Sequence, residues 1–359
     1  LSQKKKMEEE EREVVVQQPN NDDDKQRRLA YVMSLEKIEA DFYRGRTPKM
    51  HLPRVFGGQI IAQALVAAYE TVPAGLSVHS LHAYFLRPGS TDQPILYQVT
   101  RFRDGRTMAT RKVEAIQLGK VKFAAMLSFH AKEPGYVHQD PMPNVPPPEE
   151  VMEENDSKMK FLASEPNIPS VAKAWLSSSL QLGFPIELRR IEPRWLHNFL
   201  GGVKRPGFQA AWIKAAGRLA DDSRVHQVVA AYMSDMLLMS SALRPHGAWW
   251  KDVQTASIDH TIWFHHDFKA DDYLLYVMDS PQAGGARGLN FGRFYDRSGK
   301  LVISTAQEGL MRLRQPKRQH TAATQNGNST SKPKTTHSEL PFKSKNIELS
   351  NGTTRRSAL

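Results

Sequence analysis

An aspartate surrounded by apolar residues is the strongest candidate for chemistry in this sequence. Asp235 lies in the run VVAAYMSDMLLM, inside a predicted helix, and a buried carboxylate without a partner is costly. Desolvation raises the pKa of such a group, which makes it a better general base near neutral pH. Ser257, before IDHTIWF, and Gln307, at the end of a predicted strand, are two further polar residues among apolar neighbours. Taken alone, all three residues also fit structural roles. Asp235 could be a hydrogen-bonded or surface residue of the helix, Ser257 a hydroxyl at a strand edge or cap, and Gln307 a strand residue exposed to solvent.

The chain of 359 residues contains no cysteine. This excludes a disulfide framework, a thiol nucleophile and a zinc site with cysteine ligands. There is also no G-x-S-x-G segment of the kind that presents a nucleophilic serine. For a hydrolytic reaction, direct attack by water is therefore the simplest mechanism.

The stretch RVFGGQIIAQALVAAYE (54–70) predicts a helix that has no polar face. Gln63 is the one polar residue in its interior, whereas a surface helix has a polar side. The stretch is too short to cross a membrane. An antiparallel sheet that curves around the helix would hide it from water. Gly57 and Gly58, at its start, permit close approach of another backbone or of a ligand, with plain strand-to-helix packing as the alternative.

A helix followed by antiparallel strands is predicted twice along the chain. Residues 29–45 have apolar side chains at helical spacing, and strand-like runs with Asp-Gly and Leu-Gly breaks follow the apolar helix. Residues 221–243 predict a second, largely apolar helix, again followed by strands. The predicted organisation is a flexible charged lead (1–28), a first helix–sheet unit (29–131), a linker and crossing segment (132–190), a second unit with the candidate residues (191–313) and a disordered basic tail (314–359).

The net charge of +11 is concentrated near the C-terminus. Residues 313–359 contain nine Lys and Arg and two acidic residues, so they carry +7, and the rest of the chain is nearly balanced. This tail is rich in Ser, Thr, Asn and Lys and has little to bury, which is typical of disorder. The basic residues are not interleaved with aromatic ones, so we expect no nucleic-acid binding.

Six segments, in this order, resemble the acyl-CoA thioesterase II family, which includes bacterial and peroxisomal enzymes. They are RVFGGQIIAQAL, HSLHAYFLRPG, RDGRTMATRKVEAIQLGKVKFAAMLSF, AAYMSD, ASIDHTIWFH and STAQEGLMR, within residues 30–313. The resemblance implies an α+β fold of the double hotdog type, in which two helices are each wrapped by part of one continuous antiparallel sheet. It also implies hydrolysis of an acyl-CoA thioester to a free fatty acid and CoA. We expect neither a metal nor a cofactor.

The resemblance also assigns roles to the candidate residues. The family uses an Asp, a hydroxyl residue and a Gln to hold and activate the attacking water, and these match Asp235, Ser257 and Gln307. Asp235 is then the general base. The predicted helix of the first half has Gln63 and no carboxylate, so one active site per chain is expected.

Substrate contacts are predicted at two further places. The start of the first helix, Gly57, Gly58 and Gln59, offers free N–H groups to a polarised or anionic oxygen. Arg287, in the segment GGARG, is predicted to meet a phosphate of CoA. We expect no stable membrane insertion.

Two other functions stay open at this point. An acyl-thioester hydratase or dehydratase would use a His with an acid, for which Asp235 and His260 are the candidates. A non-catalytic acyl-CoA-binding protein would bind the thioester without releasing a thiol. The terminal residues Ser357-Ala358-Leu359 resemble the S-K-L type of peroxisomal import signal, so we expect the peroxisome and its import receptor, with the cytosol or mitochondrion as alternatives. Exposed sheet faces are expected to pair in a homo-oligomer.

Overall fold

The computed structural model of the chain describes residues 22–48, 52, 54–181, 183–200, 202–248 and 252–314. The predicted basic tail from residue 315 onward, with Ser357-Ala358-Leu359, and the lead up to residue 21 lie outside these residues. No helix in the described ranges is long and apolar enough to span a membrane.

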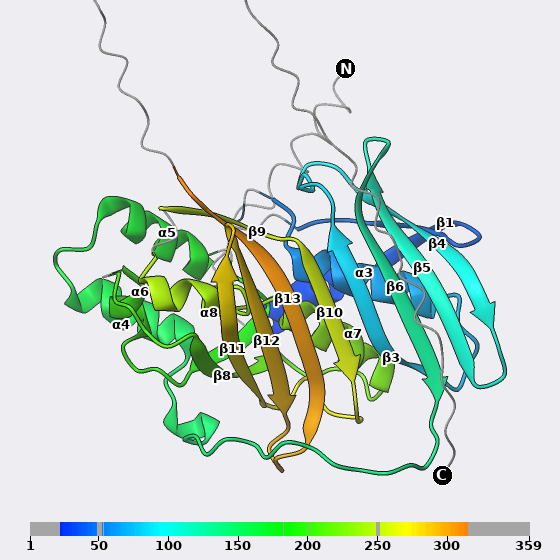
Figure 1. Cartoon of the computed structure of the whole chain (residues 1–359). Coiled ribbons are helices and arrows are strands. Elements are labelled where there is room, and N and C mark those ends of the chain that lie inside the picture. The colour runs from blue at the N-terminus through cyan, green and yellow to red at the C-terminus, as the bar shows by residue number, and fades with distance from the viewer. Residues whose placement is uncertain are drawn as a thin grey trace, which may run out of the picture. The chain divides into compact units, whose positions relative to one another are not determined.

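One antiparallel sheet runs through both halves of the chain (Figure 1). Its strands follow the order β1-β2-β4-β5-β6-β3-β10-β13-β12-β11-β8-β7, and β9 pairs with β13. The halves join where β3 pairs with β10, with Ser80 opposite Trp263 and Tyr84 opposite Asp259. The strands are β1 (Leu35–Glu39), β2 (Phe42–Gly45), β3 (Leu76–Phe85), β4 (Ile95–Asp104), β5 (Met108–Gln117), β6 (Lys120–Ala131), β7 (Ile186–Arg190), β8 (Phe208–Ala215), β9 (Val253–Ser257), β10 (Asp259–Phe264), β11 (Leu274–Gly284), β12 (Arg287–Tyr295) and β13 (Leu301–Leu313).

Two long helices lie on the same side of this sheet and contact each other. Helix α3 (Gly57–Tyr69) packs on β4, β5 and β6 and also contacts α2 (Asp22–Met33), while α7 (Ser223–Ser234) contacts β8 and β10. Because protein surrounds α3, even Gln63 is fully buried, and its amide hydrogen-bonds to Tyr97 Oη and to the carbonyl of Val32. The predicted double hotdog architecture, with a largely apolar helix inside a sheet, is confirmed.

The first helix is shorter than the apolar spacing of residues 29–45 predicts. Helix α2 ends at Met33, and the chain then forms the hairpin β1–β2, which turns at Asp41 with a positive φ of 57°. Pairing of β2 with β4 places Tyr43 in the core. A short amphipathic segment can fit the periodicity of a helix and also that of a strand. Here a strand forms, because β2 pairs with the edge of β4.

The segment between the two halves contains more regular structure than a linker. It holds the 3₁₀ helix η1 (Pro148–Glu150), α4 (Glu154–Ser164), α5 (Ser170–Gln181) and β7, and α6 (Trp195–Leu200) follows. Helices α4, α5 and α6 lie at the end of the sheet where β7 pairs with β8 (Figure 1). Phe161, Leu176, Trp195 and Leu196 form a separate small core among them. These helices therefore add walls beside the second half of the sheet.

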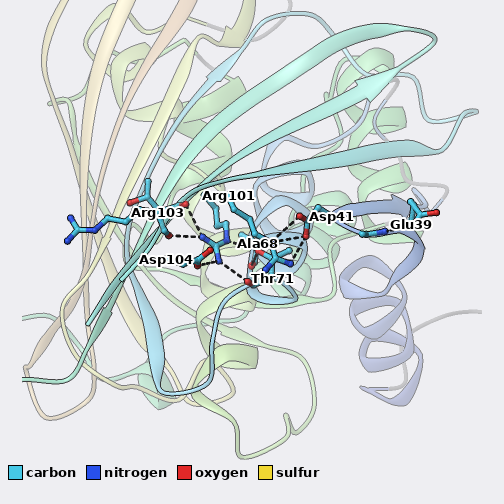
Figure 2. A network of polar contacts seen from close by, with 10 residues as sticks. Glu39, Asp41, Ala68, Thr71, Arg101, Arg103 and Asp104 are labelled. Atoms are coloured by element: carbon cyan, nitrogen blue, oxygen red, sulfur yellow. Dashed lines mark hydrogen bonds and ion pairs between the residues drawn. The ribbon is translucent and has the colours of Figure 1, made fainter. Parts of the chain in front are cut away.

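A buried arginine fixes the end of α3 that lies far from its glycines. Arg111, on β5, is fully buried and donates to the hydroxyl and the carbonyl of Thr71, just after α3, at 2.8 Å each. It also donates to the Arg103 carbonyl at 2.9 Å and pairs with Asp104 at 2.5 Å. Figure 2 shows Thr71, Arg103 and Asp104 close together in this network. Such a network holds α3 in one position along the sheet, because a buried guanidinium needs all of its partners.

Candidate active site

Asp235 lies just after the end of α7, where the predicted long helix is broken. We expected one helix over residues 221–243, but α7 ends at Ser234 and α8 (Ser240–Leu243) begins after a turn, followed by the 3₁₀ helix η2 (Arg244–His246). Leu237, in this turn, has a positive φ of 66°. Its carbonyl accepts hydrogen bonds from Gln209 Nε2 at 3.0 Å and from the Ser240 amide at 2.9 Å, which replace the helical partners. The break directs the Asp235 side chain toward α3.

The start of α3 meets the Asp235 carboxylate. The Gly58 amide donates to Asp235 Oδ2 at 2.9 Å. A Cβ atom on Gly57 would lie 2.6 Å from the same oxygen, and one on Gly58 would lie 2.3 Å from the Tyr232 carbonyl oxygen. Both distances are far below van der Waals contact, so the two glycines are needed because the N-terminus of one central helix meets the C-terminus of the other.

Gln307 connects Asp235 to Ser257. Gln307 Nε2 donates to Asp235 Oδ1 at 2.7 Å and to Ser257 Oγ at 2.9 Å. Gln307 lies in the middle of β13 rather than at a strand end, and it is 1% exposed. Ser257 is the last residue of β9, opposite Gly309 of β13. The three residues, far apart in the sequence, thus form one hydrogen-bonded group.

Burial raises the pKa of Asp235 to about 6, from an ordinary value of 3.8. Hydrogen bonds from Gln307, the Gly58 amide and Ser257 favour the charged form and limit the rise. Part of the residue's surface remains open, because Asp235 lines a cavity. The carboxylate therefore combines contact with a cavity and a pKa close to neutral, the two properties that a general base needs.

Two cavities are lined by residues at or next to the start of α3. One, of about 380 Å³, is lined by Asp235 and by apolar side chains that include Phe56, Phe184, Leu188 and Met236, and a charged cluster of Glu154, Lys158 and Arg190 forms another part of its wall. The other, of about 360 Å³, is lined by Gly57 and Ser257. A substrate that occupies both cavities would pass the Asp235–Gln307–Ser257 group.

Two residues predicted to contact substrate lie outside this group. The Gln59 side chain is buried and donates to the Arg46 carbonyl at 3.2 Å and to Thr47 Oγ1 at 3.0 Å. Arg287 is exposed at the start of β12 and pairs with Glu308 at 2.8 Å. Neither side chain contacts Asp235 among the interactions of the described residues.

His260 does not form a pair with Asp235. Its Nε2 lies 2.8 Å from Ser234 Oγ, and the imidazole is fully buried. Burial lowers the pKa of His260 to about 3, so the ring is neutral at physiological pH. The arrangement gives no support to a dehydratase dyad of His260 and Asp235. No group of three or more potential metal ligands occurs in the part of the chain that the structure describes.

Asn290, which supports Gln307, was missed in the sequence. It is fully buried on β12, opposite Gln307. Its Nδ2 donates to the Gln307 carbonyl at 3.3 Å, and its Oδ1 accepts from the Ala242 amide at 3.0 Å. Buried and more exposed residues alternate along β12, and a polar residue at a buried position is the signal that could have identified Asn290. Asn290 ties β13 to α8 and so helps to fix the position of Gln307.

Comparisons with known proteins identify the class to which this fold and site belong. A model of the acyl-CoA thioesterase family matches residues 180–310, and a model of the acyl-CoA thioesterase N-terminal domain matches residues 45–130. The chain is 40% identical over 288 residues to acyl-coenzyme A thioesterase 8 of Mus musculus, covering 79% of this chain and 88% of that protein. It is 37% identical over 287 residues to acyl-CoA thioesterase 2 of Haemophilus influenzae, covering 79% and 97%. The chain belongs to the acyl-CoA thioesterase family.

Solved structures agree with this assignment. The acyl-CoA thioesterase II TesB2 from Mycobacterium marinum is 36% identical, with a TM-score of 0.64 over 80% of this chain and 98% of that one. A protein from Alicyclobacillus acidocaldarius described as having a hot dog fold is 17% identical, with a TM-score of 0.62 over 80% and 98%. The second likeness shows the fold alone. The family and fold implied by the six sequence segments are confirmed.

Proposed function

We propose that this protein hydrolyses acyl-CoA thioesters to free fatty acid and CoA by direct attack of a water molecule that Asp235 activates. The family supports the reaction. The mechanism is supported mainly by one observation, the Asp235 carboxylate that accepts hydrogen bonds from Gln307 and Gly58 while it lines a cavity. The absence of cysteine from the sequence removes a thiol nucleophile.

In this mechanism Asp235 accepts a proton from water while the water oxygen bonds to the thioester carbon. Each carboxylate oxygen has two lone pairs, so both can accept a further hydrogen bond besides those from Gln307 and Gly58. Ser257 and Gln307 hold the water and the carboxylate in place. When the carbon–sulfur bond breaks, the proton on Asp235 passes to the CoA thiolate, which restores the base.

The start of α3 supplies the electrostatic part of the mechanism. Unpaired N–H groups and the positive end of the helix dipole favour negative charge at a helix N-terminus. The carbonyl oxygen gains negative charge as water attacks, and the positive end of α3, which meets Asp235 through the Gly58 amide, stabilises this charge. The first half of the chain thus stabilises the charge that the base of the second half creates.

The test is release of free CoA across a series of acyl chain lengths, for the wild type, Asp235→Ala and Gln307→Ala. We expect Asp235→Ala to lose about 100- to 10,000-fold in kcat, as is typical for a positioned base. Full activity in Asp235→Ala would refute the assignment of the base. Wild-type protein that binds acyl-CoA and releases no thiol would instead favour the non-catalytic binding function.

We also propose a homo-oligomer and a peroxisomal location. The sheet face opposite α3 and α7 exposes Tyr84, Met126, Trp263 and Phe291, which supports pairing of sheet faces. A relative from Saccharomyces cerevisiae, 23% identical over 302 residues, is named peroxisomal acyl-coenzyme A thioester hydrolase 1, which supports the location. Light scattering tests the first proposal. Imaging of the tagged protein with and without substitution of Leu359 tests the second.

A further inference from the structure

The cavity beside Ser257 contains two arginines that have no acidic partner. Arg54 and Arg87 line this cavity together with Gly57 and Ser257, and both are exposed. Neither forms an ion pair with any residue in the described ranges. Arg87 Nη1 donates to the Val121 carbonyl at 2.9 Å, which leaves most of its five N–H donors free. The residues that line this cavity include no acid, so it is locally positive.

The other cationic side chains near the site are already neutralised. Arg190, on the wall of the apolar cavity, pairs with Glu154 at 2.7 Å. Arg244 pairs with Glu192 at 2.8 Å, and Arg287 pairs with Glu308 at 2.8 Å. A polyanion would have to displace an acid at each of these positions, but it would displace none at Arg54 and Arg87.

We propose that Arg54 and Arg87 bind the phosphate groups of CoA, so that CoA occupies the cavity beside Ser257 and the acyl chain occupies the apolar cavity beside Phe56. This inference rests on the proposed function. CoA carries its phosphates at the end of the molecule remote from the sulfur, and arginine binds phosphate with two parallel hydrogen bonds. Asp235 lines the apolar cavity and Gly57 lines the other, and a Cβ atom on Gly57 would lie 2.6 Å from Asp235 Oδ2, so a thioester that joins the two cavities lies at these residues.

The experiment compares two substrates that share one acyl group, an acyl-CoA and the corresponding acyl-pantetheine, which has no phosphate. We expect Arg54→Ala and Arg87→Ala each to lower kcat/KM for acyl-CoA by about ten-fold, mainly through KM, as is usual for loss of a charge-assisted hydrogen bond. In the double variant, which combines Arg54→Ala with Arg87→Ala, the ratio of kcat/KM for acyl-CoA to kcat/KM for acyl-pantetheine should fall by at least about ten-fold. Arg87→Lys should restore part of the ratio.

Arg103→Ala is the matched control, because it removes an exposed arginine that lies outside both cavities. Its ratio should equal that of the wild type. The Kd of CoA alone, measured by calorimetry, should rise about ten-fold or more in the double variant and should not change in the control. The wild-type Kd should also weaken as salt is added, because ions screen charges at an exposed site.

Three outcomes would overturn the proposal. An unchanged ratio in the double variant would show that the two arginines do not bind phosphate. An equal loss with both substrates would show that they act on the thioester or on the fold. A larger loss in Arg287→Ala than in the double variant would place the phosphates at the β11–β12 turn. Failure of the proposed function has a different signature, namely tight CoA binding by wild-type protein with no thiol released from either substrate.

Discussion

Replacement of Asp235 by Asn tests the proposed base and its environment together. The new amide has nearly the same shape, its oxygen can still accept from the Gly58 amide, and Gln307 can rotate its own amide to accept from the new NH₂ group. The fold should therefore persist. Catalysis should fall by about 100- to 10,000-fold, because an amide cannot accept the proton of the attacking water.

The raised pKa of Asp235 fixes the expected pH dependence. With a pKa of about 6, about one tenth of the carboxylate is ionised at pH 5, so wild-type kcat/KM should fall about ten-fold for each pH unit below 6 and stay level above it. Asp235→Asn should lack this acid limb. Thiol release measured from acid to mildly basic pH gives both curves.

The same shift predicts a gain in stability for this variant. The pKa of Asp235 is about 6 in the folded protein and has its ordinary value of 3.8 in the unfolded chain, so the folded protein binds the proton more tightly. The stability of the wild type therefore falls as the pH rises through the interval from 3.8 to 6, by up to about 3 kcal/mol for a shift of this size. Asp235→Asn should remove this pH dependence and be more stable than wild type above pH 6, by at most this amount.

Denaturant unfolding at pH 5 and pH 8 measures the stability change, and Asp92→Asn, at an exposed position, is the matched control. The control should match the wild type in both activity and stability. The reasoning fails if Asp235→Asn keeps more than a tenth of wild-type kcat, or if the wild-type acid limb persists in the variant. A variant that is inactive and much less stable at pH 8 would contradict the account of a carboxylate that is costly to bury.

Three further substitutions follow from the same contacts. Gly58→Ala should destabilise the fold by about 1–3 kcal/mol in denaturant unfolding and lower kcat, because the alanine Cβ would clash with the Tyr232 carbonyl. A variant as stable as the wild type would contradict the close contact between the two helices. Arg111→Met should cost about 1–3 kcal/mol, because it leaves the buried hydroxyl and carbonyl of Thr71 without their donor, and a melting temperature equal to that of the wild type would refute this. Ser257→Ala should lower kcat more than ten-fold, with Ser257→Thr close to wild type, and equal rates for both would exclude the hydroxyl.

The architecture could be predicted because apolar periodicity and element order carry it. An apolar helix that begins with Gly57 and Gly58 requires cover on every side, and the sheet, α2 and α7 provide it. The family segments extended this prediction to Asp235, Ser257 and Gln307, which the structure brings into one hydrogen-bonded group. The role of each residue in catalysis stays a prediction until the variants are measured.

Features that depend on contacts between distant parts of the chain could not be predicted. The pattern around Asp235 is helical, but Gln209 and Ser240 stabilise a turn at Leu237 that no local pattern indicates. The hairpin after α2 forms because β4 offers an open edge, which the sequence of residues 29–45 does not record. The same holds for Arg54, which lies far in sequence from the other arginine of its cavity.

The place of β13 in the sheet has a consequence for the newly made polypeptide. This strand is the last one in the described region, yet it lies between β10 and β12 near the middle of the sheet and carries Gln307. A nascent chain that has emerged only as far as β12 would have Asp235 and Gly58 but no carboxamide between them and Ser257. We therefore predict that hydrolysis requires the final strand to insert between its two neighbours, and that a chain that ends before β13 is inactive toward its substrate.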